Sequence, residues 1–424
     1  MTTYYVRKDG NDTTGDGSTG APWLTITKAL ATVSAAGGHT IKVGAGTYNE
    51  DSSGFFYITK RFTAFSTIES ESGNAADVII MGASSTTYNV LFSDNCYRIE
   101  FKNVSFISRT TGLDAVQLLG CNNIKLTNCI ISTLADANGK AAIRIQPSTS
   151  INNDLITIEN CTISAPGANT AYGIYLQYRA TYVNTNISIT NCTITANTIG
   201  IYANYVTGLA LSGGSVQATN NVAVLLGADG EIGNPVSGTI SGVNVIGGAS
   251  HAFLIGAGCN GVTVTNCVIT GGDEGLIFKE CVNCTATGCT ISNSTDYCVY
   301  FKAADTCTLT NCNLNNFVSD GIQINLGGTG NTNTDLTITN NKIKISGDGK
   351  VFNFVTAAMS TGIVSDYNTY KLGAAKFGVV LGDADVQNLA ELRAAWATYD
   401  VTTNDSHSKM WSDGGAMLLF MRKR

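Results

Sequence analysis

The sequence predicts an all-β solenoid, in which the chain winds through successive coils and each coil packs only against its neighbours. The first observation is a repeat in which Asn or Gly precedes a Cys and closes a β-like run, at intervals of 22 to 32 residues. The second is that runs such as LTIT and GIYL alternate apolar and other residues, as strands do. The third is that no long stretch of helical period separates neighbouring copies. The repeated cysteines are Cys129, Cys161, Cys192, Cys267, Cys289 and Cys312, and Gly214 and Val243 fill the same position in the gap between Cys192 and Cys267.

The position before the Cys indicates a sharp bend between two strands. Asn and Gly are the residues that best tolerate a positive φ, and one left-handed residue turns an extended chain abruptly. A coil also supplies the long crossover that parallel strands require, because its other strands make the connection. The predicted bends are Asn103, Asn128, Asn160, Asn191, Asn266, Asn311 and Asn340, with Gly213, Gly242 and Gly288 in the remaining coils.

The two ends of the chain differ from the repeats and predict caps. Residues 1–53 are expected to form an N-terminal cap and first coil, with a short helix over Ile26, Ala29, Leu30 and Val33 that Gly37-Gly38 ends. About 10 to 12 coils should fill residues 54–370, and residues 371–424 should form a C-terminal capping segment. Its one helix is expected along the apolar stripe Val386, Leu389, Leu392, Trp396 and Tyr399, followed by a final strand or an oligomer contact at Met417–Met421.

Composition excludes several classes of function. The net charge of −6 argues against nonspecific nucleic-acid binding, which depends on a basic surface. No apolar run reaches the roughly 18 residues of a membrane span. The N-terminus lacks the basic and apolar regions of a signal peptide. An extracellular protein would then leave the cell by another route, have lost a leader, or be released by lysis as virion parts are.

The thirteen cysteines are expected to be mostly buried free thiols that stack between coils. Cys284 and Cys307 fall at the inward position that Val262 holds in its own coil. Some disulfides remain an alternative, and so does a metal site. Cys281 and Cys284 have the CxxC spacing of a metal motif, but neither a second pair nor a nearby His completes four ligands.

With these features the chain resembles the right-handed parallel β-helix superfamily, which includes pectate lyases, polygalacturonases and phage tailspikes. The resemblance rests on the asparagine bends, on an N-terminal module and on a closing segment, and it covers nearly the whole chain. It implies the fold strongly and the activity weakly, because one fold hosts many functions. Tailspikes of this fold are often trimers, so the resemblance also implies a homotrimer and a virion-associated or extracellular location. The stretches that carry the resemblance at the two ends are Tyr4–Val6, Asp9–Asp12, Gly20–Trp23, Thr25–Ala31, Ile41–Tyr48, Asp366–Asn368 and Asn404–Ser408.

An acidic column is the first candidate site. Its segments Gly272–Gly275 and Ser319–Ile322 resemble the acidic strand starts of polygalacturonases, although faithful copies of that family's other motifs are absent. Carboxylates about 4.8 Å apart on neighbouring coils repel, so one should have a raised pKa or bind a cation. Three interpretations of the column are open: a catalytic site, a Ca²⁺-binding site, or solvent-exposed turns. Ca²⁺ is the only cofactor that the sequence suggests. The column is His251, Glu274, Asp296, Asp320 and Lys350, one residue from each of five successive coils.

An outward-facing patch of aromatic and amide side chains is the second candidate site. Sugars combine apolar ring faces with hydroxyl edges, so tyrosines beside Arg, Gln and Asn favour glycan binding. A loop that lengthens one coil beside them supports a binding surface, whereas tyrosine is also common on any sheet face. The predicted substrate-binding residues are Arg144, Gln146, Tyr175, Gln177, Tyr178, Arg179, Tyr202 and Asn204.

These features predict a protein that engages a polysaccharide along its strand face. The leading hypothesis is a glycoside hydrolase or polysaccharide lyase; in a hydrolase, Glu274, Asp296 and Asp320 would supply the acid and the base. The alternatives are a phage-tail or cell-surface adhesin that binds glycan without cleaving it, and a structural stalk.

Overall fold

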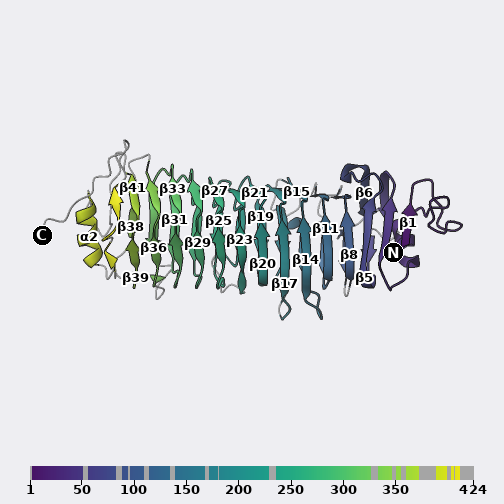
Figure 1. Cartoon of the computed structure of the whole chain (residues 1–424), viewed down its shortest axis with the longest axis horizontal. Coiled ribbons are helices and arrows are strands. Elements are labelled where there is room, and N and C mark those ends of the chain that lie inside the picture. Colours follow the sequence, from purple (N-terminus) through teal and green to yellow (C-terminus); the bar gives the residue numbers. More distant parts are fainter. Residues whose placement is uncertain are drawn as a thin grey trace. The chain divides into compact units, whose positions relative to one another are not determined.

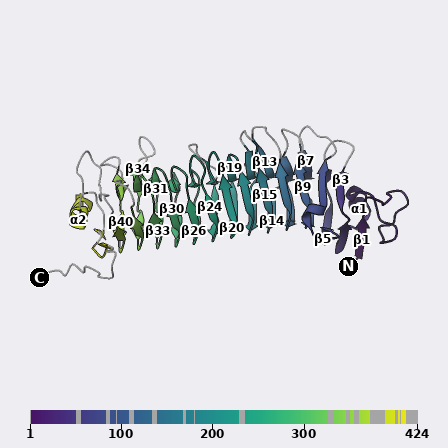
Figure 2. The same ribbon diagram turned by 90° about the horizontal axis from the view of Figure 1, so that it is seen from above.

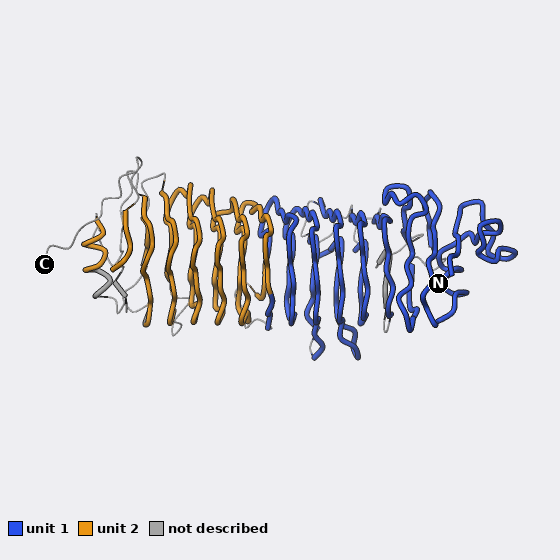
Figure 3. Tube along the Cα trace, in the orientation of Figure 1, with its two compact units in different colours: residues 1–224, 235–238 blue, residues 225–234, 239–424 orange. Residues whose placement is uncertain are grey.

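A computed structural model describes residues 2–50, 56–82, 88–93, 96–108, 114–133, 139–167, 171–179, 181–228, 235–325, 333–345, 350–354, 360–371, 388–398, 403–404 and 406–410. The chain forms two compact units, residues 1–224 with 235–238 and residues 225–234 with 239–424 (Figure 3). The predicted strand at Met417–Met421 and two residues of the predicted helical stripe, Val386 and Tyr399, lie outside the described residues.

In unit 1 the strands form three parallel sheets, A, B and C, which the chain visits in turn (Figure 1). Sheet A contains β1 (Thr2–Val6), β2 (His39–Val43), β5 (Arg61–Ser70), β8 (Tyr97–Lys102), β11 (Asn122–Thr127), β14 (Asn153–Glu159), β17 (Asn184–Thr190) and β20 (Val206–Ser212). Sheet B contains β3 (Gly46–Glu50), β6 (Val78–Gly82), β9 (Ser105–Ser108), β12 (Ile130–Thr133), β15 (Thr162–Ala165), β18 (Thr193–Ala196) and β21 (Ser215–Ala218). Sheet C contains β4 (Phe56–Ile58), β7 (Tyr88–Ser93), β10 (Asp114–Leu119), β13 (Lys140–Gln146), β16 (Ala171–Leu176) and β19 (Ile199–Ala203).

Unit 2 repeats the same three-sheet arrangement. Its A strands are β26 (Thr263–Thr265), β29 (Thr285–Thr287), β32 (Thr308–Thr310), β36 (Thr337–Thr339), β40 (Val364–Asp366) and β42 (Thr403–Asn404). Its B strands are β24 (Asn244–Ile246), β27 (Val268–Thr270), β30 (Thr290–Ser292), β33 (Asn313–Asn315), β37 (Lys342–Lys344), β41 (Thr369–Lys371) and β43 (Lys409–Met410). Its C strands are β25 (Phe253–Ile255), β28 (Leu276–Lys279), β31 (Tyr297–Lys302), β34 (Asp320–Asn325) and β38 (Phe352–Phe354). A separate pair joins β35 (Asn333–Thr334) to β39 (Ser360–Thr361), while β22 (Val224–Leu226) and β23 (Val236–Ser241) contain residues of both units.

The sharp bends lie where the sequence predicts them. All seven asparagines have φ between 51° and 59°, and Gly213, Gly242 and Gly288 have φ of 61°, 62° and 67°. The bend residues also bond to one another between coils, since Asn128 Nδ2 donates to Asn103 Oδ1 at 3.0 Å. The predicted fold class, an all-β parallel β-helix solenoid, is confirmed.

Each coil buries its inward residues against the same position of the next coil. In sheet A, Ile124 pairs with Ile156, which pairs with Ile187, and all three are fully buried. The thirteen cysteines are free and buried, and strand register stacks Cys129 on Cys161 and Cys161 on Cys192. The interior is therefore mostly apolar, with buried asparagine pairs such as Asn153–Asn184 and Asn341–Asn368 between coils.

Two helices and one 3₁₀ turn, η1 (Ala75–Asp77), accompany the described strands. The N-terminal helix α1 (Ile26–Thr32) lies beside β1 and β3 (Figure 2) and buries Ile26, Ala29 and Leu30, as predicted. It ends at Thr32, before the predicted Gly37-Gly38 stop, because Val33 already has an extended backbone. In unit 2, α2 (Leu389–Thr398) begins after Asn388, whose side chain accepts hydrogen bonds from the N–H groups of Ala390 and Glu391.

Candidate functional site

On the outer face of sheet C in unit 1, six of the predicted binding residues form two rows together with Gln117, which the sequence did not select. Strand register places Gln117, Arg144, Tyr175 and Tyr202 one above the other, and this set is called the first row. The same register gives a second row two positions further along each strand, Gln146, Gln177 and Asn204. Three cross-links join the rows: Gln117 Nε2 to Gln146 Oε1 at 3.2 Å, Arg144 Nη1 to Gln177 Oε1 at 2.7 Å, and Asn204 Nδ2 to the Tyr202 hydroxyl at 3.3 Å.

Asp114 is an important residue of this site that the sequence prediction missed. Its carboxylate accepts two hydrogen bonds from Arg144, from Nε at 2.6 Å and from Nη2 at 3.0 Å, and a third from the backbone N–H of Ala141 at 2.7 Å. Asp114 is 1% exposed and Arg144 is 8% exposed, so both charges are buried and compensate each other. The sequence did contain a signal: an Asp at the start of one strand and an outward-facing Arg on the next strand of the same sheet. Using it required knowing how these two strands pair.

The tyrosines of the first row stack face to face. The rings of Tyr175 and Tyr202 are 5.0 Å apart between centroids and 4° from parallel, and the guanidinium carbon of Arg144 lies 5.0 Å from the Tyr175 centroid. Tyr172 packs against both rings at a tilt. Burial, with the neighbouring Tyr202 and Tyr172, raises the pKa of Tyr175 to about 12, against the opposing charge of Arg144. Both faces of the Tyr175 ring are thus occupied, and the row offers a ligand its edges and polar atoms.

The remaining two predicted binding residues lie on the loop that follows β16. Tyr178 is exposed and meets Tyr205 edge to face, with centroids 5.4 Å apart. Arg179 and Tyr182 close the loop through an antiparallel bridge, with a backbone hydrogen bond of 2.9 Å. The structure therefore places all eight predicted binding residues on three adjoining strands of sheet C, β13, β16 and β19, or just after β16 and β19, but Arg144 is more buried than a surface binding residue.

The acidic column of unit 2 needs one correction. Strand register and backbone hydrogen bonds align one residue from each of the five coils. In order, these residues are His251, Glu274, Tyr297, Asp320 and Lys350. The prediction that Asp296 occupies this column was wrong by one residue. The physical reason is core packing: Val299 and Phe301 are the inward residues of β31, and Phe301 stacks on Phe278 at 4.9 Å.

Two members of the column are held by specific partners. The Nδ1 atom of His251 lies 2.5 Å from Glu274 Oε2. Asp320 accepts a hydrogen bond at each oxygen, from the Lys350 backbone N–H at 3.0 Å and from Asn353 Nδ2 at 2.6 Å. Lys350 thus reaches Asp320 through its backbone. Glu274 is committed to orienting the imidazole, while Asp320 is anchored as an acceptor.

Asp296 remains part of the same cluster although it lies one position earlier in the strand. Burial raises its pKa, the charges of Glu274 and Asp320 raise it further, and hydrogen bonds with Ser319 and Tyr297 act in the opposite direction. Tyr297 in turn has a raised pKa, caused by burial and by the charge of Asp296. The cluster therefore places a carboxyl whose pKa is raised beside a carboxylate that accepts two N–H groups, which is a pairing suited to acid–base chemistry.

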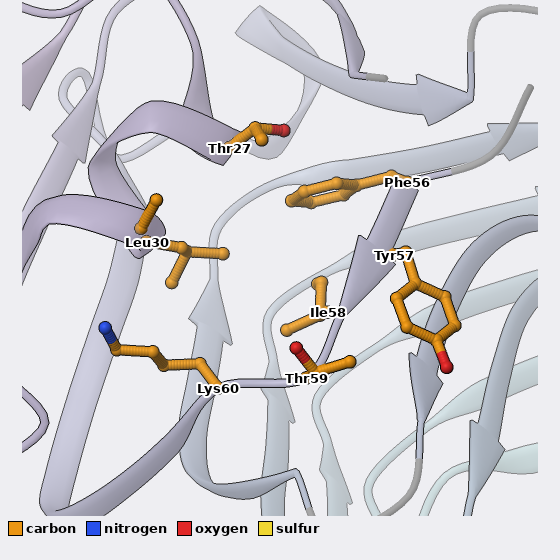
Figure 4. A pocket seen from close by; sticks show the side chains of 8 residues that line it. Thr27, Leu30, Phe56, Tyr57, Ile58, Thr59 and Lys60 are labelled. Carbon is orange, nitrogen blue, oxygen red and sulfur yellow. The ribbon is translucent and has the colours of Figure 1, made fainter. Parts of the chain in front are cut away.

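Two further features bear on the location of a site. Among the described residues, no group of three or more His, Cys, Asp or Glu side chains is arranged to hold a metal ion, and no helix is long and apolar enough to cross a membrane. A cavity of about 170 Å³ lies between α1 and β4, where Phe56 and Ile58 face Leu30 (Figure 4). Its lining has no carboxylate, and it contains none of the residues predicted from the sequence to bind or catalyse.

Comparisons with solved structures agree with the fold. The A-module of the mannuronan C-5 epimerase AlgE4 from Azotobacter vinelandii is 13% identical with a TM-score of 0.50, covering 91% of this chain and 95% of that one. A double mutant of the periplasmic alginate epimerase AlgG is 9% identical with a TM-score of 0.51, covering 85% and 84%. No curated protein matches the sequence.

Two family models match the sequence. The model described as a right handed beta helix region matches residues 231–373. It agrees with the resemblance drawn from the asparagine bends, and the chain has the right-handed parallel β-helix fold. The second model matches residues 8–249, which is more than half of the chain. The chain therefore belongs to the family described as protein of unknown function, DUF1565.

Proposed function

We propose that this protein engages a polysaccharide on the outer face of sheet C and hydrolyses it at the carboxylate cluster of unit 2. The observation that carries the hydrolytic part is the raised pKa of Asp296 beside Asp320, whose two oxygens accept N–H groups. Glycosidases use such a pair, one carboxyl protonated and one ionised, on either side of the scissile bond. The two epimerases of similar fold are named for alginate or mannuronan, which supports a polysaccharide as the class of partner.

In the proposed reaction Asp296 gives its proton to the glycosidic oxygen as the bond to the anomeric carbon breaks. Asp320 either takes a proton from the attacking water or adds to the anomeric carbon and is released by water in a second step. In both routes water supplies the new hydroxyl and Asp296 regains a proton. Glu274 orients His251 through the 2.5 Å contact, so that the second imidazole nitrogen is available to a sugar hydroxyl.

Glycan binding without cleavage is the second candidate function. The two rows of unit 1 favour it, because Tyr175, Gln177 and Asn204 offer edges and amides without any carboxylate of the unit 2 cluster. In this function the protein would act outside the cell or on a virion as an adhesin.

A glycan panel separates these functions. The protein is incubated with neutral and uronate polysaccharides, and new reducing ends and absorbance of unsaturated uronate are followed together with binding. We expect new reducing ends without unsaturated product, as hydrolysis gives. Reducing ends together with unsaturated product would indicate a lyase. Binding without any product would indicate an adhesin. The rate of hydrolysis should be at least about a hundredfold lower in the Asp296→Asn variant, with its folding unchanged. Full activity in this variant would refute the assignment of Asp296 as the acid.

The binding face has its own test. The double variant Tyr175→Ala with Tyr202→Ala is expected to weaken binding of the recognised glycan, whereas Phe65→Ala, which changes an exposed aromatic residue of β5 in sheet A, should not. Equal affinity in the double variant would remove the two rows as the binding surface.

A further inference from the structure

Gln117 has a buried acceptor without a partner. Its side-chain oxygen Oε1 makes no hydrogen bond to the described residues, although Gln117 is only 1% exposed. Its other amide atom, Nε2, is used, because it donates to Gln146 Oε1 at 3.2 Å. A buried acceptor left unpaired has a free-energy cost that a folded protein seldom bears without a reason.

The position of Gln117 connects this unpaired atom with the candidate binding face. Gln117 stands in the first row directly beside Arg144, and the row continues through Tyr175 and Tyr202. Among the described residues the other unpaired buried atoms, His39 Nδ1 and Ser294 Oγ, lie outside the two rows. The unpaired oxygen therefore coincides with the surface that the sequence selects on independent grounds.

The charges around Gln117 indicate that the missing partner of Oε1 is an uncharged hydrogen-bond donor. Arg144 is the cation next to Gln117, but its Nε and Nη2 atoms bond to Asp114, and the buried pair has no net charge. An anionic ligand group would face the oxygen of Gln117 and the carboxylate of Asp114, both of which are acceptors. A hydroxyl group can donate to Oε1 and needs no counter-ion.

We propose that Gln117 is a specificity-determining residue whose Oε1 accepts a hydrogen bond from a hydroxyl of an uncharged sugar unit. This inference rests on the proposed polysaccharide binding and names the class of sugar at this position. Rotation of Gln146, which is half-buried, uncovers the amide, and the sugar hydroxyl then supplies the donor that the free protein lacks.

The proposal implies opposite effects on stability and on binding. Gln117→Met keeps an unbranched side chain of similar length but removes both polar atoms. Removing the unpaired acceptor should raise the urea midpoint of the free protein. The same change should weaken binding of a neutral glycan about tenfold, since one hydrogen bond to the ligand is lost. A residue with only a structural role would not give this combination.

The experiment uses the full chain and oligosaccharides of β-1,3-glucan, galactomannan and xyloglucan as neutral probes, with oligogalacturonate as the charged probe. Gln217→Met is the matched control, because Gln217 is exposed on β21 of sheet B in the same unit. We expect wild type to bind a neutral probe more tightly than oligogalacturonate, and only Gln117→Met to lose affinity while gaining stability.

Each other outcome has a distinct meaning. Preference for oligogalacturonate, or unchanged neutral affinity in Gln117→Met, overturns the inference while the proposed polysaccharide binding stands. A lower urea midpoint in Gln117→Met also overturns it, because the oxygen would then have a permanent partner within the folded protein. Failure of wild type to bind any probe overturns the proposed function, and the inference with it.

Discussion

Asp114 and Arg144 form a two-pronged ion pair on the outer face of a sheet, yet both side chains are almost fully buried. The carboxylate also accepts the Ala141 N–H, and the guanidinium reaches Gln177 at 2.7 Å. The pair thus fixes the middle of the first row from three directions. Arg144 positions Tyr175 and Gln177, and its direct contact with a ligand is secondary.

Removing one partner of this pair is expected to be costly. Asp114→Asn leaves Arg144 buried without its counter-charge and should lower the free energy of unfolding by about 3–5 kcal/mol. Urea denaturation followed by circular dichroism measures this. The control is Glu71→Gln, which breaks the partly exposed Arg7–Glu71 pair at 2.6 Å and should cost less than about 1 kcal/mol. Similar losses in the two variants would contradict the assigned role of burial.

The pH profile of hydrolysis should respond to Glu274. The charge of Glu274 contributes to the raised pKa of Asp296, after burial, and Asp296 must be protonated to act as the acid. Glu274→Gln removes this negative charge, so the pKa of Asp296 should fall and the alkaline limb of kcat/KM should move to lower pH. Glu280→Gln, which lies just after the end of β28 in the same coil, should leave the limb in place. A limb that stays or moves upward in Glu274→Gln would exclude Asp296 as the acid.

Acid should loosen the last described coil before the rest of unit 2. Burial alone would raise the pKa of Asp366, but hydrogen bonds from the ring and backbone of His407 and from the Tyr367 N–H hold it below its ordinary value. Because the folded-state pKa is depressed, the stabilisation is present above the unfolded value of about 4 and is lost as pH falls through the folded value. Hydrogen exchange of residues 406–410 at pH 3 and pH 7 measures this.

Asp366→Asn supplies the control for that measurement. It should expose residues 406–410 to exchange already at pH 7, because Asn cannot give the same charge-assisted bond to His407. Equal protection of these residues in wild type at both pH values would show that the Asp366–His407 contact does not stabilise the coil.

The interior thiols should be unreactive in the folded protein because all thirteen are buried, including Cys284, whose pKa is lowered by hydrogen bonds with Cys281 and Cys307. The pKa of Cys161 is raised to about 12 by its hydrogen bond with Cys129 and by burial, while its hydrogen bond with Cys192 acts in the opposite direction. Cys161 therefore forms little thiolate at pH 8. An aromatic disulfide reagent should therefore modify few of the thirteen thiols at pH 8, and all of them in guanidinium chloride. Rapid reaction of several thiols without denaturant would mean that the core opens or that the stacking of Cys129, Cys161 and Cys192 is wrong.

The bends and the stacking were predictable because they depend on local chemistry. A positive φ favours Asn or Gly, and ten such positions at intervals of 22 to 32 residues mark where the coils turn. The inward cysteines and isoleucines follow from these turns by alternation. The same reasoning led to the two outer rows, since a residue between two buried ones must face outward.

The errors in register arose where either of two alternating sets of residues in a short strand could face the core. In β31 the run YCVYFK can place either Cys298 and Tyr300 or Val299 and Phe301 inward, and the stacking of Phe301 on Phe278 decides for the second. Asp114 was missed for a related reason: its partner lies 30 residues away, and only correct register brings it to Arg144. Pairing between coils is a tertiary property, and the alternating pattern of one strand does not contain it.

The recurring asparagine corner also bears on how proteins of this kind lengthen and shorten. The ten described Asn and Gly corners share one left-handed backbone geometry, so excising or duplicating the stretch from one of them to the next would join matching backbone conformations. Such an event within unit 1 would add or delete a single tier of the outer rows and leave the remaining tiers intact. The length of the proposed binding face can therefore change by whole tiers, independently of the chemistry that each tier presents.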